Sequence, residues 1–155
     1  MMDIYDRLKQ LDIDVSKAPA KGGIYSPAKS FLKKLVYVSG CGPQVDGVCE
    51  FKGKVGREVS LEQAQKMARN CAVNILAVLN REIGDLNRVG NVVKILGFVA
   101  SDEHFTKQPK VLNAASQLFI DVFGEESGCA ARSAIGINVL PDDIPVEIEL
   151  IVELK

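Results

Sequence analysis

The chain has 155 residues, with 19 Lys or Arg against 20 Asp or Glu, so its formal net charge is −1. This balance excludes a basic field that would attract nucleic acid or an anionic membrane. A hydrophobic fraction of 47% predicts a folded globular protein, and the length suits one domain over residues 1–155. The apolar runs are too short to span a membrane and the N-terminus is acidic, unlike a secretion signal, so we expect a cytoplasmic protein.

The cysteine and histidine content gives little support for a metal site. Cys41, Cys49, Cys71 and Cys129 form no C-x-x-C pair, and His104 is the single histidine. These residues lack the spacing of a zinc site, so we expect no metal. Buried or semi-buried thiols in a reducing compartment explain the cysteines instead.

The N-terminal third predicts one short helix and a pair of strands. Apolar residues spaced between charges at residues 3–11 predict an amphipathic helix within an N-terminal extension, residues 1–17. The apolar run at residues 35–38 predicts a strand that stops at the turn-rich segment 39–43. A turn signal follows, and residues 48–51 predict a short return strand.

A long helix is predicted to begin at Ser60. Ser60 and Gln63 have the spacing of a capping box, in which each side chain accepts a hydrogen bond from the other residue's backbone N–H. Apolar residues then recur at helical spacing as far as Ile83, and Gly84 provides a C-terminal stop.

The following elements predict an α+β domain. Residues 92–99 are apolar on both faces of a strand, which indicates cover on both sides and therefore a second subunit. Residues 109–123 carry a second amphipathic stripe that ends at Gly124. Because only two long helices are available, we expect both to pack on one face of a mixed sheet.

The C-terminal stretch from Gly128 to Leu154 reads as two strands joined around residues 141–143. The first strand opens with Arg132, whose guanidinium can grip a carboxylate with two parallel hydrogen bonds or form a salt bridge to a neighbouring glutamate. In the second strand Glu147, Glu149 and Glu153 share the polar face, and the pattern alone does not distinguish a functional glutamate from a solvated one.

The order Arg-Ser-x-x-x-x-x-x-Leu-Pro followed by Val-Glu-Ile-Glu resembles the C-terminal motif of the RidA/YjgF family, also described as endoribonuclease L-PSP-like. The resemblance covers residues 18–154. It implies a chorismate-mutase-like fold, a homotrimer with sites between subunits, and hydrolysis of 2-imino or enamine acids to 2-keto acids. Arg132 matches the family arginine that holds the substrate carboxylate, and Glu147 matches the glutamate that positions the hydrolytic water.

Five further positions match substrate-binding positions of the family. Tyr25 lies in Gly-Ile-Tyr-Ser, where isoleucine replaces the usual proline, and Asn113 matches an asparagine early in the second helix. Ser39 and Gly40 match a Ser-Gly-Gln turn in which Cys41 replaces glutamine. Ala134 stands where deaminases of the family often carry cysteine. These departures, with the N-terminal extension, are typical of a divergent subgroup.

A tight hairpin between the last two strands would separate Arg132 from Glu147 by about 7 residues along the ladder, roughly 23 Å at the rise of a strand. Two residues so far apart cannot serve one small substrate. Either they come from different subunits, or the two strands are not hairpin neighbours.

Three functions follow as hypotheses. The leading hypothesis is hydrolytic deamination of a small 2-imino or enamine acid, with a carboxylate-bearing metabolite as the partner. No organic cofactor is expected, because this hydrolysis needs none. The second is a non-catalytic protein that binds small carboxylates in the same cleft. The third is the endoribonuclease or translation-inhibitor activity, against which stand the net charge of −1 and the single histidine.

Overall fold

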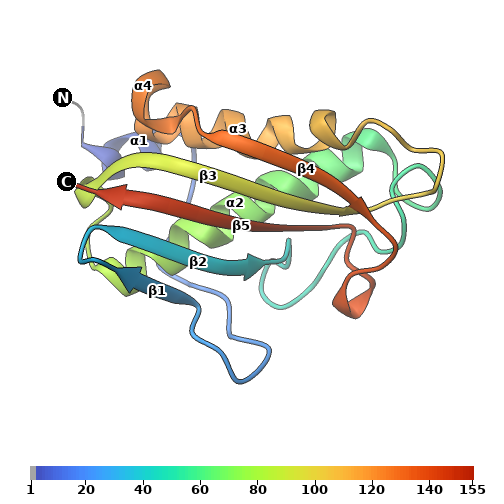
Figure 1. The fold of residues 1–155 in the computed structure, drawn as a ribbon, viewed down its shortest axis with the longest axis horizontal. Helices are drawn as coiled ribbons and strands as arrows, with labels where there is room; N and C mark the ends of the chain where they lie inside the picture. Colours follow the sequence, from blue (N-terminus) through green and yellow to red (C-terminus); the bar gives the residue numbers. More distant parts are fainter. Residues whose placement is uncertain (1–2) are drawn as a thin grey trace.

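A five-stranded mixed sheet organises the computed structural model, which describes residues 3–155 (Figure 1). Its strands are β1 (Ala28–Phe31), β2 (Leu35–Cys41), β3 (Val89–Ala100), β4 (Ala131–Ile137) and β5 (Val146–Leu154). Their spatial order is β1-β2-β5-β3-β4, and every pairing is antiparallel except that of β3 with β4. The helices are α1 (Ile4–Gln10), α2 (Leu61–Ile83), α3 (Gln108–Phe123) and the short α4 (Glu125–Gly128), with 3-10 turns at Leu86–Arg88 and Pro141–Asp143.

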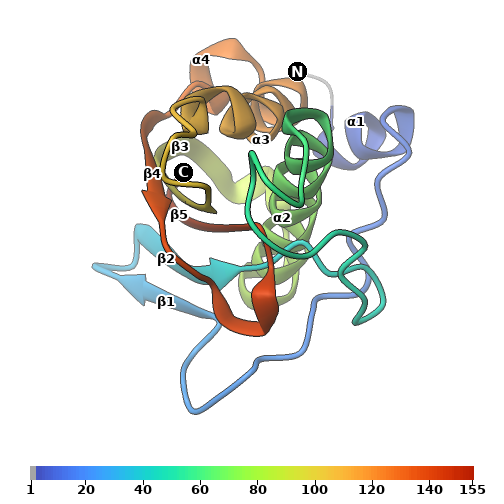
Figure 2. The same ribbon diagram turned by 90° about the vertical axis from the view of Figure 1, so that its right-hand side faces the viewer.

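The two long helices form a second layer on one face of the sheet (Figure 2). Side chains that alternate along β5, such as Ile148 and Leu150, are buried beneath them. Within residues 3–155 no helix covers the opposite face, which we call the open face. The predicted α+β class, with both long helices on one face, is confirmed. None of the helices among residues 3–155 combines the length and apolar character that a membrane crossing requires.

Helix α2 begins and ends as its sequence predicts. The backbone N–H of Ser60 donates to Gln63 Oε1 at 2.8 Å, and the N–H of Gln63 donates to Ser60 Oγ at 3.2 Å. Gly84 ends the helix at φ 78°, a left-handed conformation that glycine adopts without strain. Local hydrogen bonds and backbone conformation therefore define both ends of α2.

Two expectations for the N-terminal strands are wrong. The partner of β2 is β1, which precedes it, and residues 48–51 form no strand. β2 also continues through Ser39 and Gly40 to Cys41 rather than stopping at the turn-rich segment. A register shift between Val38 and Cys41 leaves these two small residues without partners in the ladder with β5, as in a β-bulge.

The predicted hairpin of the last two strands is also wrong. β3 lies between β4 and β5, so the second alternative, that these strands are not neighbours, is correct. The physical reason is the crossover β3-α3-β4, which places β4 parallel to β3 at the sheet edge and leaves the other side of β3 for β5.

Candidate functional site

A cavity of about 1110 Å³ lies at the end of β2, between residues 14–27, helix α2 and the start of β5. Four of the residues predicted to form the site line it: Tyr25, Ser39, Gly40 and Glu147. They come from separate parts of the chain and meet because β5 pairs with β2.

Glu147 lies directly over Gly40. A Cβ added at Gly40 would lie 2.3 Å from Glu147 Oε1, so any larger residue there would require the carboxylate to move. The side chain is half-buried and makes no hydrogen bond or ion pair with any of residues 3–155. Burial raises the pKa of Glu147, and the nearby charge of Glu149 raises it further.

The other two glutamates of β5 already have hydrogen-bond or ion-pair partners. Glu149 accepts a hydrogen bond from the hydroxyl of Tyr37 at 2.5 Å, and this bond raises the pKa of Tyr37. Glu153 pairs with Lys34 at 2.9 Å and accepts a hydrogen bond from Asn91 at 2.8 Å. Glu147 is therefore distinguished from its neighbours by its environment, a distinction that the alternating sequence pattern could not make.

Tyr25 and Ser39 fix the wall of the cavity that the 14–27 segment forms. The Tyr25 hydroxyl accepts a hydrogen bond from the backbone N–H of Gly22 at 3.1 Å. Ser39 Oγ donates to the carbonyl of Ser26 at 2.7 Å, which ties this segment to β2. Direct contact of either side chain with a substrate stays a prediction.

Cys41 also lines the cavity but is unsuited to be a nucleophile. Burial, and then the negative charge of Glu147, raise the pKa of the Cys41 thiol to about 12, although Arg81 acts in the opposite direction. The thiolate is the reactive form of cysteine, so this side chain contributes shape rather than reactivity at neutral pH.

Arg132 lies at the other side of the sheet, on the edge strand β4. Its Nη1 donates to Asn113 Oδ1 at 3.1 Å and to Ser116 Oγ at 2.9 Å, both on α3. Within residues 3–155 it forms no salt bridge, so the alternative of an ion pair with a neighbouring glutamate is not realised. Ser116 was not predicted as a site residue, although its position three residues after Asn113 places both on one helix face.

The strand register separates Arg132 from Glu147 within one chain. Arg132 pairs with Ile95 of β3, and Glu147 pairs with Phe98. Side chains alternate along a strand, so positions three apart point to opposite faces of the sheet. The two Cα atoms are about 14 Å apart by strand rise and spacing. A single copy does not bring both groups to one small molecule.

Ala134 belongs with Arg132 rather than with the cavity. It pairs with Gly97 of β3 and packs against the core beside α3. The predicted residues thus fall into two groups, the cavity group around Glu147 and the edge group of Arg132, Asn113 and Ala134.

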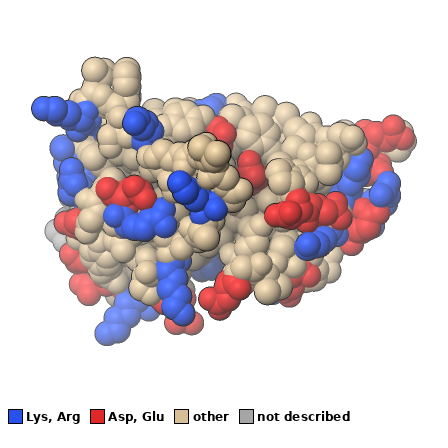
Figure 3. All heavy atoms as spheres, turned by 90° about the horizontal axis from the view of Figure 1, so that it is seen from below, with Lys and Arg blue, Asp and Glu red and all other residues tan. Residues whose placement is uncertain are grey.

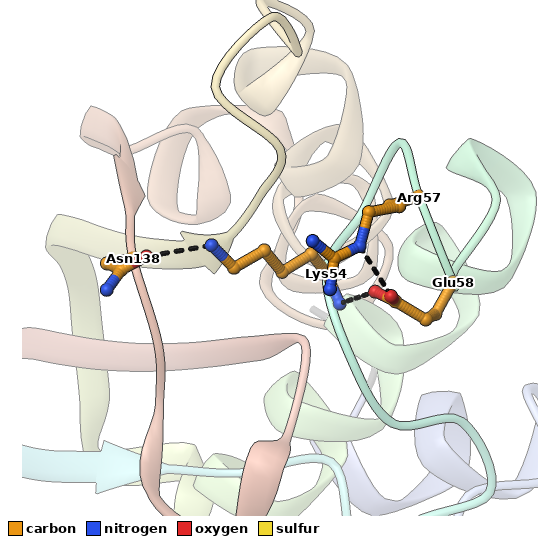
Figure 4. Close-up of polar contacts among 4 residues, drawn as sticks. All are labelled: Lys54, Arg57, Glu58 and Asn138. Carbon is orange, nitrogen blue, oxygen red and sulfur yellow. Dashed lines mark hydrogen bonds and ion pairs between the residues drawn. The ribbon is translucent and has the colours of Figure 1, made fainter.

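A second cavity, of about 450 Å³, contains none of the predicted residues. Its cations are held by partners (Figure 4): Lys54 Nζ donates to Asn138 Oδ1 at 2.7 Å, and Arg57 pairs with Glu58 at 2.5 Å. The backbone N–H of Lys54 also donates to Glu58 at 2.9 Å. Nowhere among residues 3–155 do three His, Cys, Asp or Glu side chains gather as a metal-ligand set.

Comparison with known proteins identifies the family. The endoribonuclease L-PSP family model matches residues 15–154. Protein TCP17 of Trypanosoma cruzi is 42% identical over 154 residues, covering 96% of this chain and 92% of that protein. The Agrobacterium tumefaciens protein Atu1372, of unknown function, is 41% identical with a TM-score of 0.87, over 98% of this chain and 92% of that one. A Shewanella oneidensis structure matches 99% of this chain and 100% of its own with a TM-score of 0.93, and its 24% identity supports the fold alone. The chain therefore belongs to the endoribonuclease L-PSP family, which is the YjgF/RidA family.

Proposed function

We propose that the protein hydrolyses small 2-imino or enamine acids to 2-keto acids and ammonia, at sites shared by two copies of the chain. The observation that carries the proposal is a half-buried, unpaired carboxylate of raised pKa, Glu147, at the wall of a cavity. A general base is most effective when its pKa approaches the working pH, and burial moves Glu147 in that direction.

The proposed reaction needs only water and these side chains. Arg132 binds the substrate carboxylate with the guanidinium donors that Asn113 and Ser116 leave free. Glu147 accepts a proton from water while the oxygen attacks the imine carbon, and the C=N electrons move to nitrogen. The resulting carbinolamine gains a proton on nitrogen and expels ammonia, and its hydroxyl becomes the carbonyl of the 2-keto acid. Holding the substrate beside the water supplies much of the catalysis.

Because one chain holds Arg132 and Glu147 on opposite faces of the sheet, we propose that the two residues of one site belong to different copies. Apolar side chains of the open face and its edges support such an assembly, since Phe31 is 61% exposed, Tyr37 44% and Ile135 42%. We propose a homotrimer, in which each copy offers its edge group to the cavity of the next and the ring closes with three equivalent sites.

The test is turnover of a freshly generated imine. A dehydratase releases 2-aminoacrylate in the assay, and pyruvate formation is followed with and without the protein. We expect acceleration over spontaneous hydrolysis, and a loss of about 10²-fold or more in Glu147→Gln. Arg132→Ala is expected to lose most of the acceleration as well. No acceleration by the unaltered protein would contradict the proposal, and binding of pyruvate without turnover would favour the metabolite-binding alternative.

The endoribonuclease activity in the family's name gains no support from the charges on the face that Figure 3 shows. On the face drawn in Figure 3, basic and acidic side chains are interspersed, with no unbroken basic stripe along which a phosphate backbone could lie. His104, the single histidine of the sequence, is exposed beside Glu103.

A further inference from the structure

The cavity contains two asparagines, Asn70 and Asn74, one turn apart on α2. The turn of α2 that carries them packs against the start of β5, where Cys71 Sγ donates to the carbonyl of Val146 at 3.5 Å. Asparagine is not favoured in a helix interior, so we expect each of these two side chains to make hydrogen bonds that offset its poor helix propensity.

The side chain of Asn74 has a structural role, because its amide group hydrogen-bonds the backbone. Its Nδ2 donates to the carbonyls of Gly42 at 2.8 Å and Gln44 at 2.9 Å. These two bonds attach the segment after β2 to α2, and so hold the cavity wall that continues from Gly40. Asn74 has no amide hydrogen left for a ligand.

Asn70 has no comparable role. Its side chain is half-buried and makes no hydrogen bond to any of residues 3–155. No enclosed polar side-chain atom of the described chain lacks a partner, so the unbonded Asn70 amide is open to solvent, and Asn70 lines the cavity. Val73 lies between the two asparagines on the same wall and is apolar, which leaves Asn70 as the uncommitted amide of this helix.

We propose that Asn70 is a specificity-determining residue that hydrogen-bonds the side chain of the substrate, and that the preferred substrates are 2-imino acids with a polar, hydrogen-bonding side chain. The proposal rests on the function proposed above. An amide both donates and accepts, so it matches a terminal amide, carboxyl or hydroxyl group on the substrate. The cavity of about 1110 Å³ gives such a side chain room beyond the reacting carbon.

The experiment compares imines made in the assay by an amino acid oxidase from glutamine and from leucine. In the unaltered protein we expect a higher kcat/KM for the glutamine-derived imine. Asn70→Leu, which keeps the branched shape of the side chain and removes the hydrogen bonds, is expected to lower that value about 10-fold and to change the leucine-derived value less than about 2-fold. Asn74→Leu is the matched control, and is expected to lower both values together and to lower the Tm, because it releases the wall segment.

Equal losses for both imines in Asn70→Leu would overturn the proposal and assign Asn70 a structural role. Calorimetric binding of the two corresponding 2-keto acids separates this failure from failure of the proposed function. If no imine is turned over but Asn70→Leu weakens only the polar keto acid, the deaminase proposal fails and the assignment of Asn70 stands. If Asn70→Leu leaves the binding of both keto acids unchanged, or weakens both equally, the assignment fails whether or not imines are hydrolysed.

Discussion

The environment of Glu147, more than its identity, makes it the candidate base. Three glutamates alternate along β5, and the sequence pattern treats them alike. Glu149 and Glu153 have partners, whereas Glu147 lies unpaired over Gly40. The resemblance to a family singled out this position in advance. Its raised pKa could not be predicted, because burial depends on the β2–β5 register that only the fold supplies.

The raised pKa predicts how stability depends on pH. The folded protein holds the Glu147 proton above the ordinary pKa of 4.5, so the free energy of unfolding falls as the pH rises from that value through the raised pKa. At pH 7 the half-buried charge is a cost that Glu147→Gln removes. We expect thermal unfolding of this variant at pH 7 to show a Tm higher by up to about 3 °C, with the difference disappearing near pH 4.

Glu149→Gln provides the control for that measurement. It alters a carboxylate that already accepts a hydrogen bond from Tyr37, so no gain in Tm is expected. If Glu147→Gln is less stable than the unaltered protein at pH 7, the carboxylate has a stabilising partner in solution and its description as unpaired is wrong.

Gly40 is predicted to be essential for activity. A methyl group there would lie 2.3 Å from Glu147 Oε1, so Gly40→Ala must displace the carboxylate. A displacement of about 1 Å costs on the order of 10²-fold in rate, and we expect a loss in kcat of that size in the imine assay. Gly22→Ala is the control, because Gly22 lines the same cavity and an added Cβ there meets nothing within 4 Å. Full activity of Gly40→Ala would mean that the position of Glu147 is not critical.

Elements with local signals were predictable, and elements defined by distant pairing were not. The capping box and Gly84 gave both ends of α2, and Gly124 gave the end of α3. β1 was missed because four residues with two polar side chains carry little pattern, and its turn depends on positive φ at Leu32 and Lys33. The predicted pairing of β4 with β5 was wrong because strands adjacent along the chain favour a hairpin, whereas β3 lies between these two in the sheet.

Close packing of α3 on β3 depends on Gly97. A Cβ at this position would lie 2.1 Å from Leu112 Cδ1, so Gly97→Ala must displace the Leu112 side chain or the helix that carries it. We expect a loss of roughly 1–3 kcal/mol in the free energy of unfolding, measured by urea denaturation. Gly90→Ala in the same strand is the control, because its nearest contact of 3.4 Å is ordinary and should cost much less. Equal effects would mean that the destabilisation comes from replacing a glycine in this strand, whatever its surroundings, and not from a clash with Leu112.

At the scale of the whole molecule, the two groups of predicted residues occupy different surfaces of one chain. The edge group lies with β4 and α3, and the cavity group lies beyond β5 at the end of β2 (Figures 1 and 2). If both groups act on one substrate, as proposed, the site requires an interface that joins one surface to the other, and the open face has exposed apolar area for it. The strand that is apolar on both faces also predicts a second subunit, and this stays a prediction, whereas the separation deduced from a hairpin was wrong in its register.

Complementation between inactive variants tests this arrangement directly. Arg132→Ala and Glu147→Gln chains are purified separately, unfolded and refolded together at equal amounts. If each site takes Arg132 from one copy and Glu147 from the next, about a quarter of the sites in randomly mixed assemblies combine both intact residues. We expect imine turnover to recover toward a quarter of the unaltered rate, while each variant refolded alone stays inactive. If both residues came from the same chain, every site would lack one of them, and no mixture of the two variants would recover activity.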